Sequence, residues 1–280
     1  MKPAAFTMHR PRDLEDALAL LAQHGAEARL IAGGQSLVPM MNLRLATPSV
    51  LIDLNGVDAL AGIRRDGDLL RIGACTRQQT ALESDLVQKR APLLAAALRH
   101  VGHYATRCRG TIGGSLANAD PASELALAAI TLRASVTLRD KTRARTVAAS
   151  EFFLDTMTTA LRPDEILTEI VLPAALDGTK VSFREHARRH GDFAIVAAAA
   201  QHSPKDNRLS VGLGAISTVP LICRHIEEGF HAEKLATTLD TLVATEIAGI
   251  NCLSDLRASA SYRSKLGAVC LADCVRDAIL

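Results

Sequence analysis

Residues 106–124 read T-R-C-R-G-T-I-G-G-S-L-A-N-A-D-P-A-S-E, and an almost purely apolar segment, residues 125–132, follows them. The stretch holds three glycines with hydroxyl side chains among them, then an amide and two carboxylates. Because glycine has no Cβ and tolerates positive φ, backbone N–H groups here can approach a ligand closely. Small hydroxyls, successive N–H groups and a helix start at Pro121 to Glu124 together suit a phosphate. The stretch predicts a loop that wraps a phosphate-bearing ligand and leads into a buried helix; the alternative is a plain glycine-rich turn.

A second stretch of the same kind lies about eighty residues earlier in the chain. Residues 28–31 predict a short buried strand, which runs into Gly33-Gly34-Gln35-Ser36-Leu37. A strand followed by two glycines and a hydroxyl again predicts backbone that lies close to an anion. Two such loops in one chain favour a dinucleotide, because a dinucleotide has two phosphates and two ends to hold.

The totals describe a chain that can bury a sizeable core. At 280 residues it fits two modest domains, or one domain with an appendage. Apolar residues make up 48% and charged residues 22%, which is ordinary for a globular protein. A net charge of only +2, with 3% aromatic residues and no tryptophan, argues against nucleic acid or an anionic membrane as partner.

The six cysteines do not form a metal or cluster motif. None belongs to a C-x-x-C pair, and no cysteine run matches zinc or iron–sulfur ligation. Unpaired thiols are usual in a reducing cytosol. The chain begins without the apolar stretch of a signal peptide, and no apolar run approaches the ~20 residues of a transmembrane helix. These features predict a cytoplasmic protein without a membrane span.

Hydrophobic periodicity predicts a mixture of helices and strands, with an antiparallel meander near the end. The predicted strands are 28–31, 50–54, 69–72, 134–139, 166–172, 181–186, 194–201 and 209–214, and the predicted helices are 11–24, 76–82, 92–100, 122–132, 232–249 and 259–278. Turn residues at 173–178 mark a domain boundary. The sequence therefore predicts an α+β protein with a larger domain at 1–176 and a smaller one at 177–280.

Other motifs fail on spacing or context. The run G-x-G-x-x-S at residues 212–217 follows a strand, but it lacks the third glycine and the opening βαβ unit of a Rossmann fingerprint. The chain has no P-loop, and Ser36 is not inside a G-x-S-x-G nucleophile elbow. The nine histidines are scattered and are interpreted as surface residues. The three arginines within residues 184–189 indicate either a solvated turn or a group near a ligand or partner.

Taken together, these segments resemble the FAD-binding medium subunit of the molybdenum hydroxylases, the family of xanthine dehydrogenase, carbon monoxide dehydrogenase and quinoline oxidoreductase. The segments that match are Ala32 to Leu37 with Pro39, Arg109 to Leu116, Asn118 to Pro121, Ile166 to Pro173, Ala187 to Ala194 (A-R-R-x-G-D-F-A) and Asp255 to Arg263 (D-x-R-A-S-x-x-Y-R). The likeness covers essentially the whole chain, in order and spacing. Two departures stand out: Cys108 replaces an Asn of many relatives, and Glu124 replaces the commoner Asp.

The resemblance implies an FAD-binding domain of the vanillyl-alcohol-oxidase (PCMH) type, made of two lobes with the flavin between them, and a smaller α/β C-terminal domain. It implies FAD contacts at Ile31, Ala32, Gly33, Gly34, Gln35, Ser36 and Leu37 in the first loop, and at Thr111, Gly113, Gly114, Ser115, Ala117, Asn118 and Asp120 in the second. It also places Glu124 at the ribityl chain and Leu167 on the isoalloxazine ring. Arg184 is expected near the polar edge of that ring, where a positive charge favours the reduced anion.

The function that the resemblance implies is electron transfer. Substrate would be oxidised at a molybdopterin on a large subunit, and electrons would pass through [2Fe–2S] clusters on a small subunit to FAD on this chain and then to an external acceptor. No catalytic side chain and no metal are expected on this chain. The expected assembly is a dimer of heterotrimers, and the expected substrate is an aromatic N-heterocycle such as a purine, a quinoline or a nicotine-like compound.

Two alternatives stay open at this point. A stand-alone FAD-dependent oxidoreductase would turn over substrate as the purified chain. An assembly subunit that has lost flavin would retain no cofactor after incubation with FAD.

Overall fold

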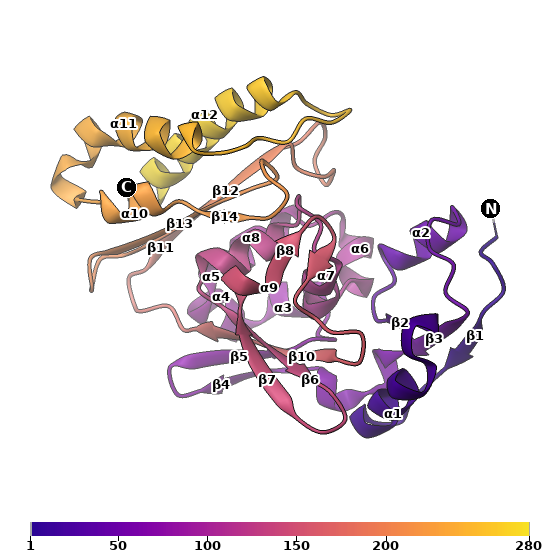
Figure 1. The fold of residues 1–280 in the computed structure, drawn as a ribbon. Coiled ribbons are helices and arrows are strands. Elements are labelled where there is room, and N and C mark those ends of the chain that lie inside the picture. Colours follow the sequence, from indigo (N-terminus) through magenta and orange to yellow (C-terminus); the bar gives the residue numbers. More distant parts are fainter. Residues whose placement is uncertain (1, 280) are drawn as a thin grey trace.

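The computed structural model describes residues 2–279. Figure 1 shows three parts in chain order: a small N-terminal lobe, a larger central lobe, and a C-terminal sheet covered by helices. Each part combines helices with a sheet, so the predicted α+β fold class is confirmed. No helix within these residues has both the length and the apolar character that crossing a membrane requires.

The N-terminal lobe is a parallel sheet in the order β1-β3-β2. Its strands are β1 (Thr7–His9), β2 (Ala28–Ile31) and β3 (Val50–Asp53), and its helices are α1 (Leu14–His24) and α2 (Leu37–Asn42). Asp13 caps α1 by accepting a hydrogen bond from the Asp16 N–H at 2.8 Å, and Gly25, with φ of 51°, ends it. The buried face of α1 packs on β3, and α2 begins directly after the first glycine loop.

The central lobe is built on an antiparallel sheet in the order β4-β5-β10-β6-β7. Its strands are β4 (Ile63–Asp66), β5 (Leu69–Gly73), β6 (Ser135–Arg139), β7 (Ala144–Ala148) and β10 (Ile166–Pro173), with a separate hairpin of β8 (Phe153–Asp155) and β9 (Thr158–Thr159). Its helices are α3 (Gln78–Glu83), α4 (Asp85–Arg90), α5 (Pro92–His100), α6 (Tyr104–Arg109), α7 (Ile112–Asn118), α8 (Glu124–Thr131) and α9 (Ala149–Phe152).

Helix α8 lies at the centre of the molecule. All its residues from Leu125 to Thr131 are buried, which explains why it is apolar on every face instead of along one stripe. It contacts α5 and α7 of its own lobe and also the strands of the C-terminal sheet.

The C-terminal part is an antiparallel sheet in the order β11-β12-β13-β14. Its elements are β11 (Lys180–His186), β12 (Val196–Ser203), β13 (Arg208–Gly214), β14 (Leu221–Ile222), α10 (Arg224–Glu228), α11 (Leu235–Ala248) and α12 (Ala260–Ile279). Helices α11 and α12 cover its outer face, and the central lobe covers its inner face (Figure 1). Because side chains alternate along a strand, Ala197 and Ala199 of β12 belong to the core shared with α8, whereas Ala198 and Ala200 belong to the core shared with α12.

One expectation about local structure is wrong. Residues 106–124 are not one long loop, because α6 and α7 occupy most of the stretch. None of Gly110, Gly113 and Gly114 has a positive φ, so these glycines do not make left-handed turns. They sit where a Cβ would collide with a neighbouring segment, and close packing is therefore the reason for glycine at these positions.

Candidate cofactor-binding site

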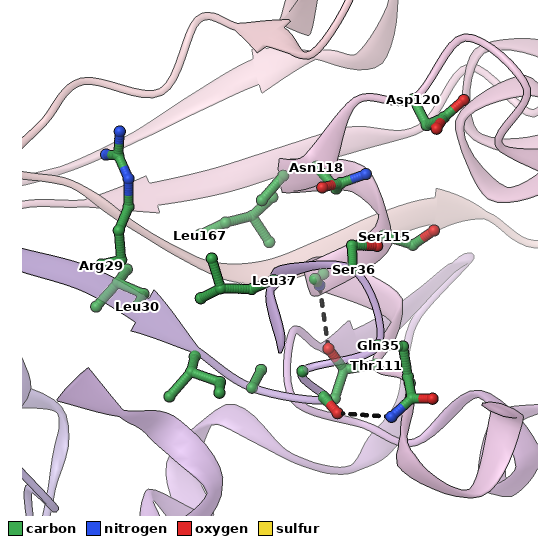
Figure 2. Close-up of a pocket in the computed structure, with 18 of the residues that line it drawn as sticks. Arg29, Leu30, Gln35, Ser36, Leu37, Thr111, Ser115, Asn118, Asp120 and Leu167 are labelled. Carbon is green, nitrogen blue, oxygen red and sulfur yellow. Dashed lines mark hydrogen bonds between the residues drawn. The ribbon is translucent and has the colours of Figure 1, made fainter. Parts of the chain in front are cut away.

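A large cavity of about 1160 Å³ lies where the N-terminal lobe, the central lobe and one loop of the C-terminal domain meet. This volume lies slightly above the roughly 300–1,000 Å³ typical of small-molecule pockets, so the cavity suits a large ligand. Its walls come from residues 28–37 and 45–48, from the stretch 110–124, from residues 157–167 and from residues 191–193. Figure 2 shows side chains from both glycine stretches and from β10 drawn around it.

The two glycine loops touch each other at the floor of this cavity. A Cβ on Gly33 would lie 2.5 Å from the carbonyl oxygen of Arg109 and 2.8 Å from the Cα of Gly110. No side chain fits in that space, so glycine at position 33 lets the loops meet. Gly34 has φ of 71° and turns the chain into α2, and the Gln35 side chain donates to the Gly33 carbonyl at 3.1 Å (Figure 2).

The second loop is a helix start. Thr111 caps α7, because its Oγ1 accepts a hydrogen bond from the Gly114 N–H at 3.1 Å (Figure 2). The Gly113 N–H donates to the Ala74 carbonyl at 2.8 Å, and a Cβ on Gly113 would lie 2.5 Å from the Ala74 Cβ. Ser123 caps α8 in the same way, by accepting from the Ala126 N–H at 3.3 Å. Helices α2, α7 and α8 thus all begin at the cavity wall, where helix N-termini favour phosphate oxygens.

Arg77 joins the two glycine loops from outside the cavity. Its guanidinium donates to the Arg109 carbonyl at 2.5 Å and to the Asn55 Oδ1 at 2.6 Å. Asn55 in turn donates to the Ala32 carbonyl at 2.8 Å. Sequence reasoning did not identify Arg77 or Asn55, because neither belongs to a motif and their partners are backbone atoms far away in the chain.

Strand β10 supplies the apolar wall. Leu167 lines the cavity, and the pairing of β10 with β6 shifts register between Leu167 and Glu169. Bulges of this kind redirect a side chain, and they are common beside functional sites. The neighbouring Glu165 is buried and forms two short bonds with Arg145, at 2.6 and 2.8 Å, which lower the pKa of the carboxyl despite its burial.

Every predicted contact except Arg184 lines the cavity. These residues are Ile31, Ala32, Gly33, Gly34, Gln35, Ser36, Leu37, Thr111, Gly113, Gly114, Ser115, Ala117, Asn118, Asp120, Glu124 and Leu167. Asp120 is also structural, because its Oδ1 accepts from the Ala122 N–H at 2.9 Å. Cys108, one of the two departures noted above, is on α6 and is not part of the cavity wall.

Arg184 does not line the cavity in this structure. Arg184 pairs with Ala198 across the sheet, so its side chain lies on the face covered by α12. There its Nε is 2.7 Å from the Asp277 Oδ2, and this hydrogen bond raises the pKa of the guanidinium. The next residue, Glu185, pairs with Ala197 and therefore lies on the opposite face of the sheet, which belongs to the core that contains α8. A shift of one residue along a strand reverses the face, and the resemblance alone did not resolve that shift.

The loop 191–193 belongs to the A-R-R-x-G-D-F-A segment, for which the sequence predicted no contact with the cofactor. Gly191, Asp192 and Phe193 line the cavity. Gly191 has φ of 78°, and a Cβ there would lie 2.6 Å from the His103 Cε1, so the loop is held against the segment before α6. The Phe193 ring is half exposed, with the Arg257 guanidinium 4.9 Å from its centre.

Comparison with known proteins agrees with this geometry. Residues 4–175 match the family model of the FAD binding domain in molybdopterin dehydrogenase, and residues 181–278 match that of the CO dehydrogenase flavoprotein C-terminal domain. The chain belongs to the FAD-binding medium subunits of the molybdenum hydroxylases. The sequence-based assignment to this family is confirmed, as are FAD as the cofactor of this chain and the class of oxidoreductase subunit.

Relatives of this medium subunit match it over most of their length. Caffeine dehydrogenase subunit beta of Pseudomonas sp. (strain CBB1) is 35% identical over 232 residues, which is 81% of this chain and 79% of the relative. The carbon monoxide dehydrogenase medium chain of Hydrogenophaga pseudoflava is 36% identical over 272 residues, or 95% and 94% of the two chains. The structure of reconstituted CO dehydrogenase from Oligotropha carboxidovorans superposes with a TM-score of 0.94 at 35% identity, covering 100% of this chain and 99% of that one.

Proposed function

We propose that this medium subunit holds FAD in the cavity between its lobes and uses it to pass electrons from partner subunits to an external acceptor. The observation that carries the proposal is the contact between the two glycine loops, where Gly33 lies against Arg109 and Gly110. That contact places the backbone of both loops at the floor of the cavity, beside the N-termini of α2, α7 and α8. When bound, FAD accepts two electrons and can release them singly, which suits a link between one-electron clusters and a two-electron acceptor.

The lining residues then divide by chemistry. The start of α2 binds the pyrophosphate through its N–H groups, and α7 contributes only the positive end of its dipole, because the Gly113 and Gly114 N–H groups already donate to Ala74 and Thr111. Leu167 packs against the isoalloxazine ring, and Asn118, Asp120 and Glu124 take hydroxyl groups of the ligand. The medium subunit thus binds, orients and shields the cofactor, and none of its side chains acts as acid or base on the substrate.

The oxidation of substrate and the first electron steps belong to other polypeptides in this proposal. A large subunit carries molybdopterin and a small subunit carries [2Fe–2S] clusters, since the six cysteines of this chain lack the spacing of cluster ligands. We propose a dimer of such heterotrimers in the cytoplasm, with the chain divided into domains 1–176 and 177–280. The substrate proposed for the complex is an aromatic N-heterocycle, which the similarity to a caffeine dehydrogenase subunit supports.

An anaerobic mixing experiment tests the electron path. The [2Fe–2S] subunit is reduced with dithionite, freed of excess reductant and mixed with the FAD-loaded medium subunit while the flavin absorbance is followed. We expect the flavin bands to bleach as the cluster absorbance returns, and an external acceptor to restore them. An unchanged flavin spectrum, or oxidation of an N-heterocycle by the medium subunit alone, would contradict the proposal and favour a stand-alone oxidoreductase.

A further inference from the structure

Glu185 carries a half-buried carboxyl, and one of its oxygens has no hydrogen-bond partner among the described residues. It lies on β11 opposite Ala197, so it is directed to the inner face of the C-terminal sheet, toward the FAD-binding domain. Phe183, two residues earlier on the same face, packs against His100 of α5 with 5.0 Å between ring centres. The Glu185 Oε2 is inaccessible to solvent and has no hydrogen-bond partner among the described residues. A buried carboxylate without a cation or donor is costly, so this group favours its neutral form.

Glu124 is the second carboxyl of the same region, and it reaches the cavity. It is the first residue of α8, across the domain junction from β11, and it lines the cavity wall. Burial raises the pKa of Glu124 to about 7, a hydrogen bond to its own backbone N–H opposes this, and the nearby Asp120 raises it further. Burial likewise raises the pKa of Glu185 to about 8, and the charge of Glu124 adds to the increase.

None of the described residues around Glu185 supplies a compensating cation. On β11 itself, Arg184 points to the other face and is held by Asp277 of α12. On α5, burial lowers the pKa of His100, and the charges of His190 and Arg99 lower it further, so His100 is neutral at physiological pH. Strand β12 presents alanines opposite Glu185 and Phe183. Asp120 is the negative group beside Glu124. Helix α12 adds Asp273 and the Cys270 thiol, which is neutral because burial raises its pKa to about 12.

We propose that Glu124 at the cavity wall and Glu185 across the domain junction act as an acid pair, and that binding of the anionic cofactor in the cavity takes up protons through this pair. The proposal rests on FAD occupying the cavity as inferred above. FAD brings the two negative charges of its pyrophosphate. A neutral Glu124 adds no repulsion and can donate a hydrogen bond to the ligand, whereas an ionised Glu124 repels it. The ligand therefore binds the protonated pair more tightly, and linkage requires proton uptake on binding.

Calorimetric titration of the purified chain with FAD tests this linkage. The titration is made at about pH 8 in buffers with different ionisation enthalpies, and the dependence of the heat on the buffer gives the number of protons taken up. At this pH ionised carboxylate is present in the pair and can accept protons when the ligand binds. We expect net uptake by the wild type, less uptake by E124Q and by E185Q, and none by the double variant. The control E228Q alters an exposed glutamate on α10 and should match the wild type. Heat that is independent of the buffer in the wild type, or unchanged uptake in the double variant, would overturn the proposal.

A second measurement needs no cofactor. Since folding raises the pKa of Glu185, the folded chain binds more protons than the unfolded one between the two pKa values, and stability falls as pH rises through that window. E185Q should therefore melt at a higher temperature than the wild type at about pH 9, and the difference should shrink toward zero at about pH 5. A difference in melting temperature between E185Q and the wild type that does not vary with pH would contradict a raised pKa of Glu185. If the chain binds no FAD at any pH, the proposed function is wrong. The melting measurement still tests the protonation of Glu185 in that case, because it needs no cofactor.

Discussion

At the scale of single residues, the site depends on positions where a side chain would not fit. Gly33 and Gly113 both lie where a Cβ would be 2.5 Å from another segment, and neither has a positive φ. Their role is to let backbone segments approach each other, and this determines where the cavity floor lies. The sequence indicated two glycine-rich stretches, and both line the cavity. It did not indicate that the two loops pack against each other, because that contact joins residues far apart in the chain.

Gly33→Ala should weaken FAD binding without unfolding the chain. The added methyl would lie 2.5 Å from the Arg109 carbonyl oxygen, so the loops must separate. Overpacking of this kind costs about 1–3 kcal/mol, which corresponds to a loss of affinity on the order of ten-fold or more. Fluorescence titration with FAD measures the change. Gly56→Ala is the matched control, since its nearest atom is 3.8 Å away, and equal affinities for the two variants would contradict the account.

Glu165→Gln should destabilise the chain at neutral pH and hardly at all in acid. Arg145 is the main cause of the lowered pKa of Glu165, so the pair stabilises the fold above the ordinary pKa of 4.5 and loses this effect as pH falls through the folded-state value. Breaking a buried pair costs about 3–5 kcal/mol. Urea unfolding across a pH series measures the loss, with the exposed Glu151→Gln as control. A loss that stays constant down to acid pH would show that the charge of Glu165 is unimportant.

At the scale of elements, long periodic segments could be predicted and several short helices could not, although the short elements β2, β5 and α3 were predicted. Helices α1, α5 and α12 and strand β10 were predicted close to their bounds, because each has an apolar pattern of several turns or alternations. Helices α2, α4, α6 and α7 have only six or seven residues each. Such helices are marginal by propensity, so tertiary contacts decide them, and two glycines inside α7 made that helix harder to recognise.

Arg263 connects α12 to the sheet that it covers. Its buried guanidinium donates to the carbonyls of Ile195 and Ala215, at 2.5 and 2.6 Å, and to Asp255 at 2.8 Å. These bonds anchor the helix at the start of β12 and just beyond the end of β13. Asp255 and Arg263 are the first and last residues of the D-x-R-A-S-x-x-Y-R motif, so one role of the motif is to hold α12 on the sheet.

Arg263→Met should therefore lower the free energy of unfolding by about 3–5 kcal/mol, because two buried carbonyls and one carboxylate lose their donor. Chemical denaturation measures it. Arg276→Met on the same helix removes only exposed bridges to Asp240 and Asp273, for which about 0–1 kcal/mol is expected. Similar losses for both variants would mean that the buried contacts of Arg263 do not stabilise the domain.

At the scale of the whole molecule, one strand belongs to two cores. Strand β12 is buried on both faces, which explains its run of alanines: large side chains would not fit between α8 and α12. This double burial also explains how Glu185 comes to face the FAD-binding domain while Arg184 does not. The sequence predicted eight strands in their order along the chain but missed β1, β4, β7, β8, β9 and β14. The face of each residue depends on register between strands, which only the fold determines.

The shared core predicts cooperative unfolding of the FAD-binding and C-terminal domains. Apolar burial continues from α5 and α8 into β12 and β13, so neither domain can unfold without exposing the core of the other. Scanning calorimetry should show one transition, with equal calorimetric and van't Hoff enthalpies. Two resolved transitions would show that the junction contributes little to stability.

The proposed function requires that this chain alone holds FAD in the cavity where its two glycine loops touch. The most direct measurement is the visible absorption spectrum of the purified chain after incubation with FAD and gel filtration, alongside Gly33→Ala. We expect flavin bands at about one FAD per chain in the wild type, and much weaker bands in the variant, because non-covalent retention through a column requires tight binding. A wild-type chain that is folded by circular dichroism and yet emerges colourless would contradict the claim.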